Sequence, residues 1–84
     1  MHVSVISAER AVFEGEADAV VAPAYDGLVG ILPRHAPFMT LLGKGIVRVS
    51  RSGEFTRLRV EGGFLQVAGD RVHVVARKAS TADY

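Results

Sequence analysis

The sequence predicts an all-β fold, a two-sheet sandwich or flattened barrel built as a single domain. Nine glycines and three prolines interrupt the 84 residues so closely that few windows could hold a helix of ordinary length, about 11 to 12 residues. Between these interruptions, apolar and polar residues alternate with period two, as they do along strands. The candidate strands recur about every 8 to 12 residues, a spacing typical of sandwiches and barrels.

The first half of the chain predicts short strands separated by turn-forming residues. Several of them are apolar on both faces, which favours strands packed within a two-layer fold over strands with one solvated face. Valine and isoleucine, which are frequent here, favour the pleated setting of a sheet. The expected strands span residues 3–6, 12–13, 17–21, 28–31 and 38–42.

The second half predicts longer strands joined by tight turns. Residues 46–50 place valines on one face and Arg48 and Ser50 on the other. After a Ser52-Gly53 turn, residues 56–60 alternate in the same way and form the returning strand of an antiparallel hairpin. Gly62-Gly63 is then expected to reverse the chain again.

The last part of the chain completes this meander. Residues 64–67, a Gly69-Asp70 turn and residues 72–76 form two more strands, and the final one is apolar enough to be largely buried. Residues 80–84 are small or polar at a terminus, which predicts a frayed tail. The expected domain therefore spans residues 1–79.

Composition excludes several classes of function. Without cysteine the chain forms no disulfide or thiolate metal site, which suits a reducing compartment. No apolar run approaches the roughly 20 residues that cross a bilayer, and residues 1–4 lack signal-peptide character, so we expect a chain that is neither exported nor membrane-spanning. So short a chain leaves little room for an enzyme cleft beside its core.

Charge is unevenly distributed although the net charge is only +1. Acidic residues gather in residues 1–26, and basic residues predominate from Arg34 to Lys78. Such asymmetry can indicate a nucleic-acid face. We prefer the interpretation that opposite charges pair across neighbouring strands and on solvated faces.

No pattern of catalytic or metal-ligating residues occurs in the sequence. Lys44 lies between two glycines but lacks the other residues of a phosphate loop. The three histidines are too scattered for a metal site, and no serine lies in a nucleophile elbow. Glu14 and Glu16 share one strand face, which a solvated edge explains. We therefore expect no catalytic residue, no metal and no cofactor.

The stretch 27–38 differs in kind from the rest of the chain. It combines two glycines and two prolines with large apolar residues that do not alternate. Proline fixes the backbone and removes an amide donor, so this stretch cannot be a central strand throughout. Two interpretations stay open: a buried crossing between the sheets, or a partner-binding surface, since a rigid apolar loop lowers the ordering cost of association.

Four blocks of sequence, spread along residues 3–79, occur in the same order as in one known family. They are Ser7-Ala8-Glu9 with Phe13 and Gly15, residues 27–33 with His35-Ala36-Pro37, residues 45–49, and residues 61–67. Together they resemble the N-terminal domain of the epsilon subunit of F-type ATP synthases, called delta in mitochondria. The second block is the most specific.

This resemblance implies a ten-stranded β-sandwich that carries out no catalysis. It implies a central-stalk subunit of a proton-translocating ATP synthase, which helps to lock the gamma subunit to the c-ring so that rotation reaches the catalytic subunits. The subunit would be a monomer in isolation, with no nucleic-acid partner. It would lie at the cytoplasmic face of the bacterial cell membrane, associated with the membrane only through the complex.

The resemblance also implies which residues meet these partners. Leu28 stands where many bacterial members have an acidic residue, so Asp26 would supply the charge toward the ring. Arg34 replaces a common glycine and adds a cation. The expected gamma contacts are Ser7, Arg34, His35, Ala36, Pro37 and Phe38, and the expected c-ring contacts are Asp26, Gly27 and Leu28.

Typical bacterial members continue into a C-terminal helical hairpin that inhibits ATP hydrolysis and in some members binds ATP. The sequence stops at Tyr84, either as a naturally short form or as an excised domain, so we expect no hairpin in it and assign it neither function. Two other classes stay open. One is a lipoyl- or biotinyl-type carrier domain with Lys44 as the attachment site. The other is a small oligonucleotide-binding barrel that uses Arg48, Arg57 and Arg59, although such proteins stack bases on aromatic faces and we expect Phe13 and Phe64 to be buried.

Overall fold

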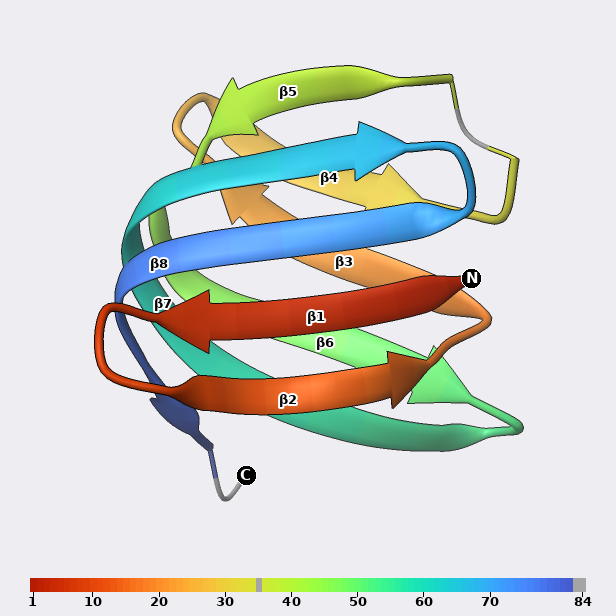
Figure 1. Cartoon of the computed structure of the whole chain (residues 1–84), viewed down its shortest axis with the longest axis horizontal. Coiled ribbons are helices and arrows are strands. Elements are labelled where there is room, and N and C mark those ends of the chain that lie inside the picture. Colours follow the sequence, from red (N-terminus) through yellow and green to blue (C-terminus); the bar gives the residue numbers. More distant parts are fainter. Residues whose placement is uncertain (35, 83–84) are drawn as a thin grey trace.

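The computed structural model describes residues 1–34 and 36–82, and these residues form strands and turns without a helix (Figure 1). The strands hydrogen-bond in the order β2-β1-β8-β7-β6-β3-β4, with β5 added to β7. The all-β class is confirmed. In chain order they are β1 (His2–Ser7), β2 (Ala11–Glu16), β3 (Ala19–Ala24), β4 (Gly27–Ile31), β5 (Phe38–Leu41), β6 (Lys44–Arg51), β7 (Glu54–Ala68) and β8 (Arg71–Thr81).

Two long strands explain why the structure has eight strands and not the expected ten. Residues 54–61 of β7 pair with β6, whereas residues 64–67 pair with β5. β8 follows the same course, because its first residues pair with β1 and its last residues pair only with the first half of β7. Each strand thus bends from one layer into the other, and counting their halves separately would give ten.

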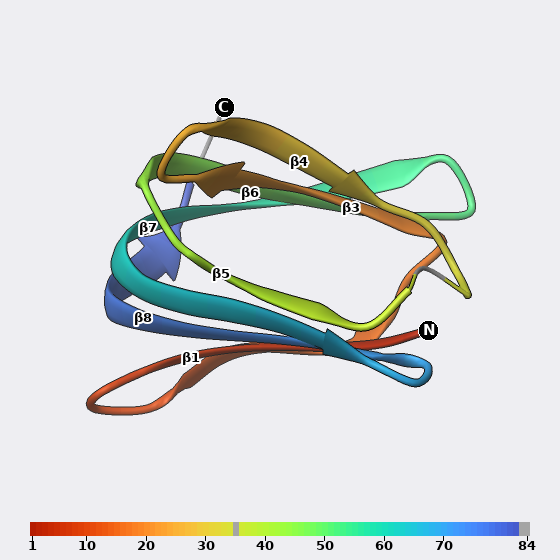
Figure 2. The same ribbon diagram turned by 90° about the horizontal axis from the view of Figure 1, so that it is seen from above.

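The connected sheet therefore folds into two layers that face each other (Figure 2). We call the layer of β5, the second half of β7, the first half of β8, β1 and β2 the lower layer, following its place in Figure 2. The upper layer holds β4, β3, β6, the first half of β7 and the end of β8. Among the described strands, β1 and β8 form the one parallel pair, so the first and last strands of the sequence lie side by side.

Gly62 and Gly63 mark the bend of β7, so the expected chain reversal at this point is wrong. Both residues adopt positive φ, 69° and 102°, and the strand continues through them without losing register with β8. A Cβ at Gly63 would collide with the carbonyl oxygen of Val75. Glycine is needed here because the backbones of β7 and β8 approach closely where both strands change layer.

The core lies between the layers and follows the predicted alternation. Val47 and Val49 are buried and Arg48 is exposed, as expected for β6. None of the buried residues in the described part of the chain is polar or charged. The buried side chains are Val3, Val5, Ala17, Val20, Ala22, Ile31, Leu42, Val47, Val49, Leu58, Val60, Leu65, Val67, Val72, Val74 and Ala76.

The expected frayed tail is wrong for its first two residues. Ser80 pairs with Arg59 and Thr81 with Leu58, so β8 continues through both. The amide of Ala82 donates a further hydrogen bond to the carbonyl of Arg57, at 3.0 Å. Backbone pairing with β7 thus keeps these small, polar residues in the strand. Residues 83–84 of the expected tail lie outside the described residues.

Within residues 1–34 and 36–82, no helix has the length and apolar character needed to cross a membrane.

Candidate interaction surface

The loop between β4 and β5 lies at the surface, at one end of the sandwich (Figure 1). Leu32 is 64% exposed, and Pro33, Arg34, Ala36 and Pro37 are also exposed. These residues therefore form a surface loop, and the interpretation of them as a buried crossing between the sheets is wrong. His35 lies outside the described residues.

Two residues of this segment have special roles in its shape. Arg34 adopts φ of 67°, a left-handed conformation that turns the chain toward β5. Phe38 begins β5 and is half-buried, and its ring packs against the core. Phe38 therefore fixes the end of the loop against the core, while the outward side chains on β5, Met39 and Leu41, are each 61% exposed.

The expected c-ring contacts lie in and after the turn between β3 and β4. Tyr25 and Asp26 form the turn, and Gly27 follows with φ of 138°. Leu28 is 76% exposed, the most exposed of the large apolar side chains that the structure describes. The amide of Tyr25 donates to the carbonyl of Leu41 at 3.0 Å, which fixes the turn against β5.

Ser7 ends β1 and organises the turn into β2. Its hydroxyl donates to the carbonyl of Arg10 at 3.2 Å and accepts hydrogen bonds from the amides of Glu9 and Arg10, at 3.3 and 3.4 Å. The hydroxyl is therefore engaged within its own turn.

Ser7 and Phe38 lie far apart in the lower layer. The strand registers place Phe38 level with Val67, Val72 and Val3, and Ser7 is four residues further along β1. Strand geometry gives a separation of about 13 Å along the strands and about 14 Å across them. The structure therefore does not bring Ser7 and Phe38, two of the six expected gamma contacts, into direct contact.

A row of apolar side chains links the two positions, and this row was missed in the sequence. Leu41 pairs with Phe64, Phe64 with Val75, and Val75 with Ile6, so the four lie in one line across β5, β7, β8 and β1. Their strand neighbours Leu65, Val74 and Val5 are buried in the core, so the alternation points the four side chains away from it. We call these four residues the outer apolar row.

The outer apolar row is open to solvent to different degrees. Leu41 is 61% exposed, and Ile6, Phe64 and Val75 are partly exposed. One end of the row lies at the edge strand β5 and the other at Ile6, the residue before Ser7. A signal was present in the sequence, because several strands are apolar on both faces, but the sequence alone suggested that Phe64 is buried.

A second row, next to the outer apolar row, is polar except for Met39 at its end. Met39 pairs with Gln66, Gln66 with His73, and His73 with Ser4. The Oγ atom of Ser4 and the Nδ1 atom of His73 are hydrogen-bonded at 2.7 Å. The surface of the lower layer is thus apolar along one line and hydrogen-bonding along the next.

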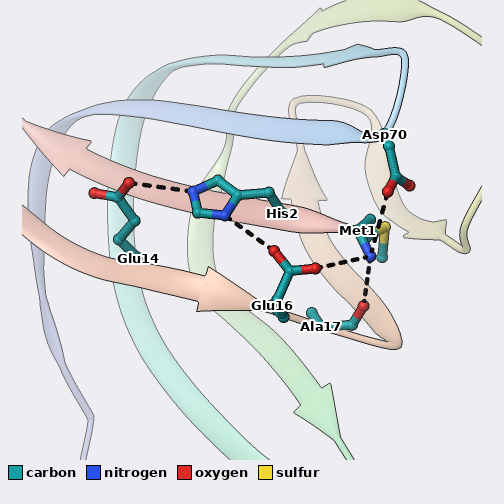
Figure 3. Close-up of polar contacts among 6 residues, drawn as sticks. All are labelled: Met1, His2, Glu14, Glu16, Ala17 and Asp70. Carbon is teal, nitrogen blue, oxygen red and sulfur yellow. Dashed lines mark hydrogen bonds and ion pairs between the residues drawn. The ribbon is translucent and has the colours of Figure 1, made fainter.

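Charged groups gather at the edge of the sandwich where β1 begins and β2 ends (Figure 3). His2 lies between Glu16 and Glu14, with Nδ1 and Nε2 at 3.1 and 3.2 Å from their carboxylates. The N-terminal ammonium lies 3.7 Å from Glu16 and 3.9 Å from Asp70, and it donates to the carbonyl of Ala17 at 3.1 Å. These contacts fasten β1 to β2, so the two glutamates are paired and are not merely solvated.

The structure also bears on the two alternative functions. Lys44 begins β6 opposite Glu61, and it is not at the tip of a hairpin, where a carrier domain would present its lysine. The strands form a two-layer sandwich rather than a small closed barrel, and Phe55 is the only aromatic ring within about 6 Å of an arginine head group in the described part of the chain. Neither alternative is favoured.

Comparison with known proteins gives one consistent family. The family described as "ATP synthase, Delta/Epsilon chain, beta-sandwich domain" matches residues 1–82. An ATP synthase epsilon chain of Desulforamulus reducens is 46% identical over 79 residues, which are 94% of this chain and 60% of the relative. An epsilon chain of Chloroflexus aurantiacus is 42% identical over 83 residues, 99% of this chain and again 60% of the relative.

Solved structures share the fold at lower sequence identity. A chain of the Euglena gracilis mitochondrial ATP synthase, solved with OSCP, F1 and c-ring, superposes with a TM-score of 0.86 at 21% identity, covering 94% of this chain and 51% of that one. A chain of the Tetrahymena thermophila mitochondrial central stalk and c-ring gives 0.73 at 14% identity, covering 94% and 64%. The chain thus spans about three fifths of the curated relatives it matches.

Proposed function

Since the chain belongs to the family of the ATP synthase delta/epsilon β-sandwich domain, we propose that it works as the rotor domain that couples c-ring rotation to the gamma subunit. The similar curated proteins are named ATP synthase epsilon chains, and the similar folds occur in ATP synthase structures that contain the c-ring. In this role the chain performs no chemistry. It transmits torque in a proton-translocating enzyme at the cytoplasmic face of the bacterial membrane.

The observation that carries this proposal is the outer apolar row. An apolar line on the outside of a sandwich is a feature of interaction surfaces, because monomeric proteins rarely expose contiguous apolar area without a function. The row runs from Leu41, on the same strand as the expected gamma contact Phe38, to Ile6, the residue before the expected gamma contact Ser7. We infer that gamma lies along the row, with Arg34, His35, Ala36, Pro37 and Phe38 at one end and Ser7 at the other.

The c-ring contact is assigned to the turn of Asp26, Gly27 and Leu28. It lies at the start of β4, and the loop that follows β4 is about 17 Å away, since β4 has five residues. The loop would therefore contact gamma while the turn contacts the ring, and the two contacts would adjoin at Leu41, whose carbonyl accepts a hydrogen bond from Tyr25 of the turn. Close-packed interiors have low compressibility, so the sandwich between the two contacts would pass on strain instead of absorbing it.

A pair of matched substitutions tests this assignment. Leu41→Asp places a charge in the outer apolar row, and Leu28→Asp places the same charge at an equally exposed leucine of the proposed ring contact. We expect Leu41→Asp to weaken binding of purified gamma by about 30-fold, corresponding to about 2 kcal/mol. Leu28→Asp should leave gamma binding within twofold and change only attachment to detergent-solubilised c-ring.

Titration calorimetry with gamma from the same organism measures the first effect, and co-sedimentation with the ring measures the second. Circular dichroism checks that both variants keep the fold. Equal affinity of wild type and Leu41→Asp for gamma would refute the role of the outer apolar row. An equal loss in both variants would refute the separation of the two contacts.

A further inference from the structure

Two arginines face each other on the outer surface of the upper layer, on the opposite side of the sandwich from the outer apolar row. Arg48 of β6 and Arg57 of β7 are direct antiparallel partners, so their Cβ atoms are about 5 Å apart. Like charges in this position destabilise a sheet. Arginine remains protonated in proteins, so the repulsion cannot be relieved by loss of a proton.

The described residues offer no carboxylate that offsets this repulsion. The ion pairs found among them involve the N-terminal ammonium, His2 and Arg77, and no described carboxylate lies within 4.0 Å of Arg48 or Arg57. Glu61 follows Arg57 by four residues on β7, but its carboxylate lies 3.6 Å from Arg77. An uncompensated pair of cations is therefore built into the centre of this layer.

One aromatic ring holds both guanidinium groups. The Cζ atoms of Arg48 and Arg57 lie 5.6 and 5.9 Å from the centroid of Phe55. Cation–π attraction at this distance orients the two flexible side chains over the ring. Beneath them the strands are anchored by Val47, Val49 and Leu58, none more than 3% exposed. The two charges are thus held in place on a rigid support.

We propose that Arg48, Phe55 and Arg57 form a docking site for two neighbouring carboxylates on an acidic segment of a partner protein. Guanidinium groups recognise carboxylates through paired, charge-assisted hydrogen bonds, and two aligned groups fit two carboxylates spaced by one helical turn. Such an occupant neutralises the opposed charges. Because the site lies on the face opposite the outer apolar row, it does not depend on the proposed gamma contact.

The same geometry argues against nucleic acid and lipid as the occupant. Single-stranded nucleic acids bind through aromatic faces on which bases stack, but the ring of Phe55 is already engaged with both guanidinium groups. Binding to a lipid surface combines charge with apolar side chains that enter the acyl region. Phe55 is the only exposed large apolar side chain of this cluster, and it is engaged in the same way.

The test uses a helical 16-residue peptide with two glutamates one turn apart, and a glutamine version of the same peptide. Nuclear magnetic resonance of the whole chain follows the Nε–Hε signals of the arginines at low salt. We expect saturable shifts at Arg48 and Arg57 with the glutamate peptide, weakening as salt is added. The glutamine peptide should bind at least tenfold more weakly.

Two double variants with the same change in net charge provide the control. Arg48→Gln with Arg57→Gln should weaken peptide binding at least tenfold, whereas Arg10→Gln with Arg71→Gln, both at exposed positions outside the cluster, should change it less than twofold. Equal loss in the two variants would show a general charge effect and overturn the proposal. So would tighter binding at Arg48 and Arg57 by oligothymidylate or by phosphatidylglycerol vesicles than by the glutamate peptide.

One further variant tests whether the chain's own acidic residue near its end occupies the site. Asp83→Asn should leave the affinity for the glutamate peptide within twofold. A tenfold gain in affinity would mean that the carboxylate of Asp83 is the occupant, and it would overturn the assignment to a partner protein.

Discussion

At the residue scale, the decisive position is Gly63. Its φ of 102° and its approach to the backbone of Val75 allow β7 to bend between the layers. Gly30 differs in both respects, since its φ is not in the left-handed region and no atom lies within 4 Å of the place where its Cβ would be. The two glycines therefore form a matched pair for testing what the bend requires.

We predict that Gly63→Ala lowers the free energy of unfolding by at least about 3 kcal/mol, because the added methyl group collides with backbone and the positive φ strains alanine. Gly30→Ala should leave the free energy unchanged or raise it by up to about 1 kcal/mol, by restricting the unfolded chain. Urea denaturation followed by circular dichroism measures both. Similar values for the two variants would contradict the role assigned to Gly63.

A second prediction concerns the hydrogen bond between Ser4 and His73. Ser4→Ala removes the hydroxyl and leaves a partly buried ring nitrogen without its partner, which should cost about 1 kcal/mol of unfolding free energy. Ser80→Ala is the control, because Ser80 is exposed and its change should stay within about 0.5 kcal/mol. Thermal melts compare the two, and an unchanged stability of Ser4→Ala would remove the contribution assigned to this bond.

Residues of β6 and β7 show what the sequence could predict and what it could not. The alternation of Val47, Arg48 and Val49 gave the correct faces, because side-chain period is a local property. Phe64 was expected in the core, since hydrophobicity alone does not distinguish a core residue from one at an interaction surface. Gly62-Gly63 was expected as a turn, because glycines in a turn and at a bend have the same local signature.

At the element scale, β8 extends further than the composition of its last residues suggests. Ser80 and Thr81 pair with β7, and Ala82 adds a backbone hydrogen bond to Arg57. This pairing joins residues about 20 positions apart in sequence, and long-range partners of this kind leave no local pattern. The parallel pairing of β1 with β8, which joins the two ends of the chain, was beyond local prediction for the same reason.

A truncation tests whether the end of β8 contributes to stability. Removing every residue after Ala79 deletes the last pairings with β7 and should lower the free energy of unfolding by about 1 to 3 kcal/mol, at about 1 kcal/mol for each lost hydrogen bond. Removing only the residues after Ala82 should have little effect. Equal stability of the two truncated chains, measured by urea denaturation, would restore the expectation of a frayed tail from residue 80.

At the scale of the whole molecule, the fold separates three surfaces around one core. The outer apolar row lies on the outside of the lower layer, the turn at Asp26 and the loop of residues 32–37 lie at the two ends of β4, and the arginine pair lies on the outside of the upper layer. Nothing in the family resemblance located the row, because it depends on the registers of β5, β7, β8 and β1. The contact roles of the loop and the turn, by contrast, were implied by the family resemblance.

The most direct test of the central claim observes the methyl groups of the chain in complex with gamma. With methyl-labelled protein, addition of gamma from the same organism should shift the signals of Ile6, Leu41 and Val75 and leave those of Val21 and Ile46, on the outer face of the upper layer, unchanged. Shifts confined to Val21 and Ile46, or a mixture in which no complex forms, would contradict the account.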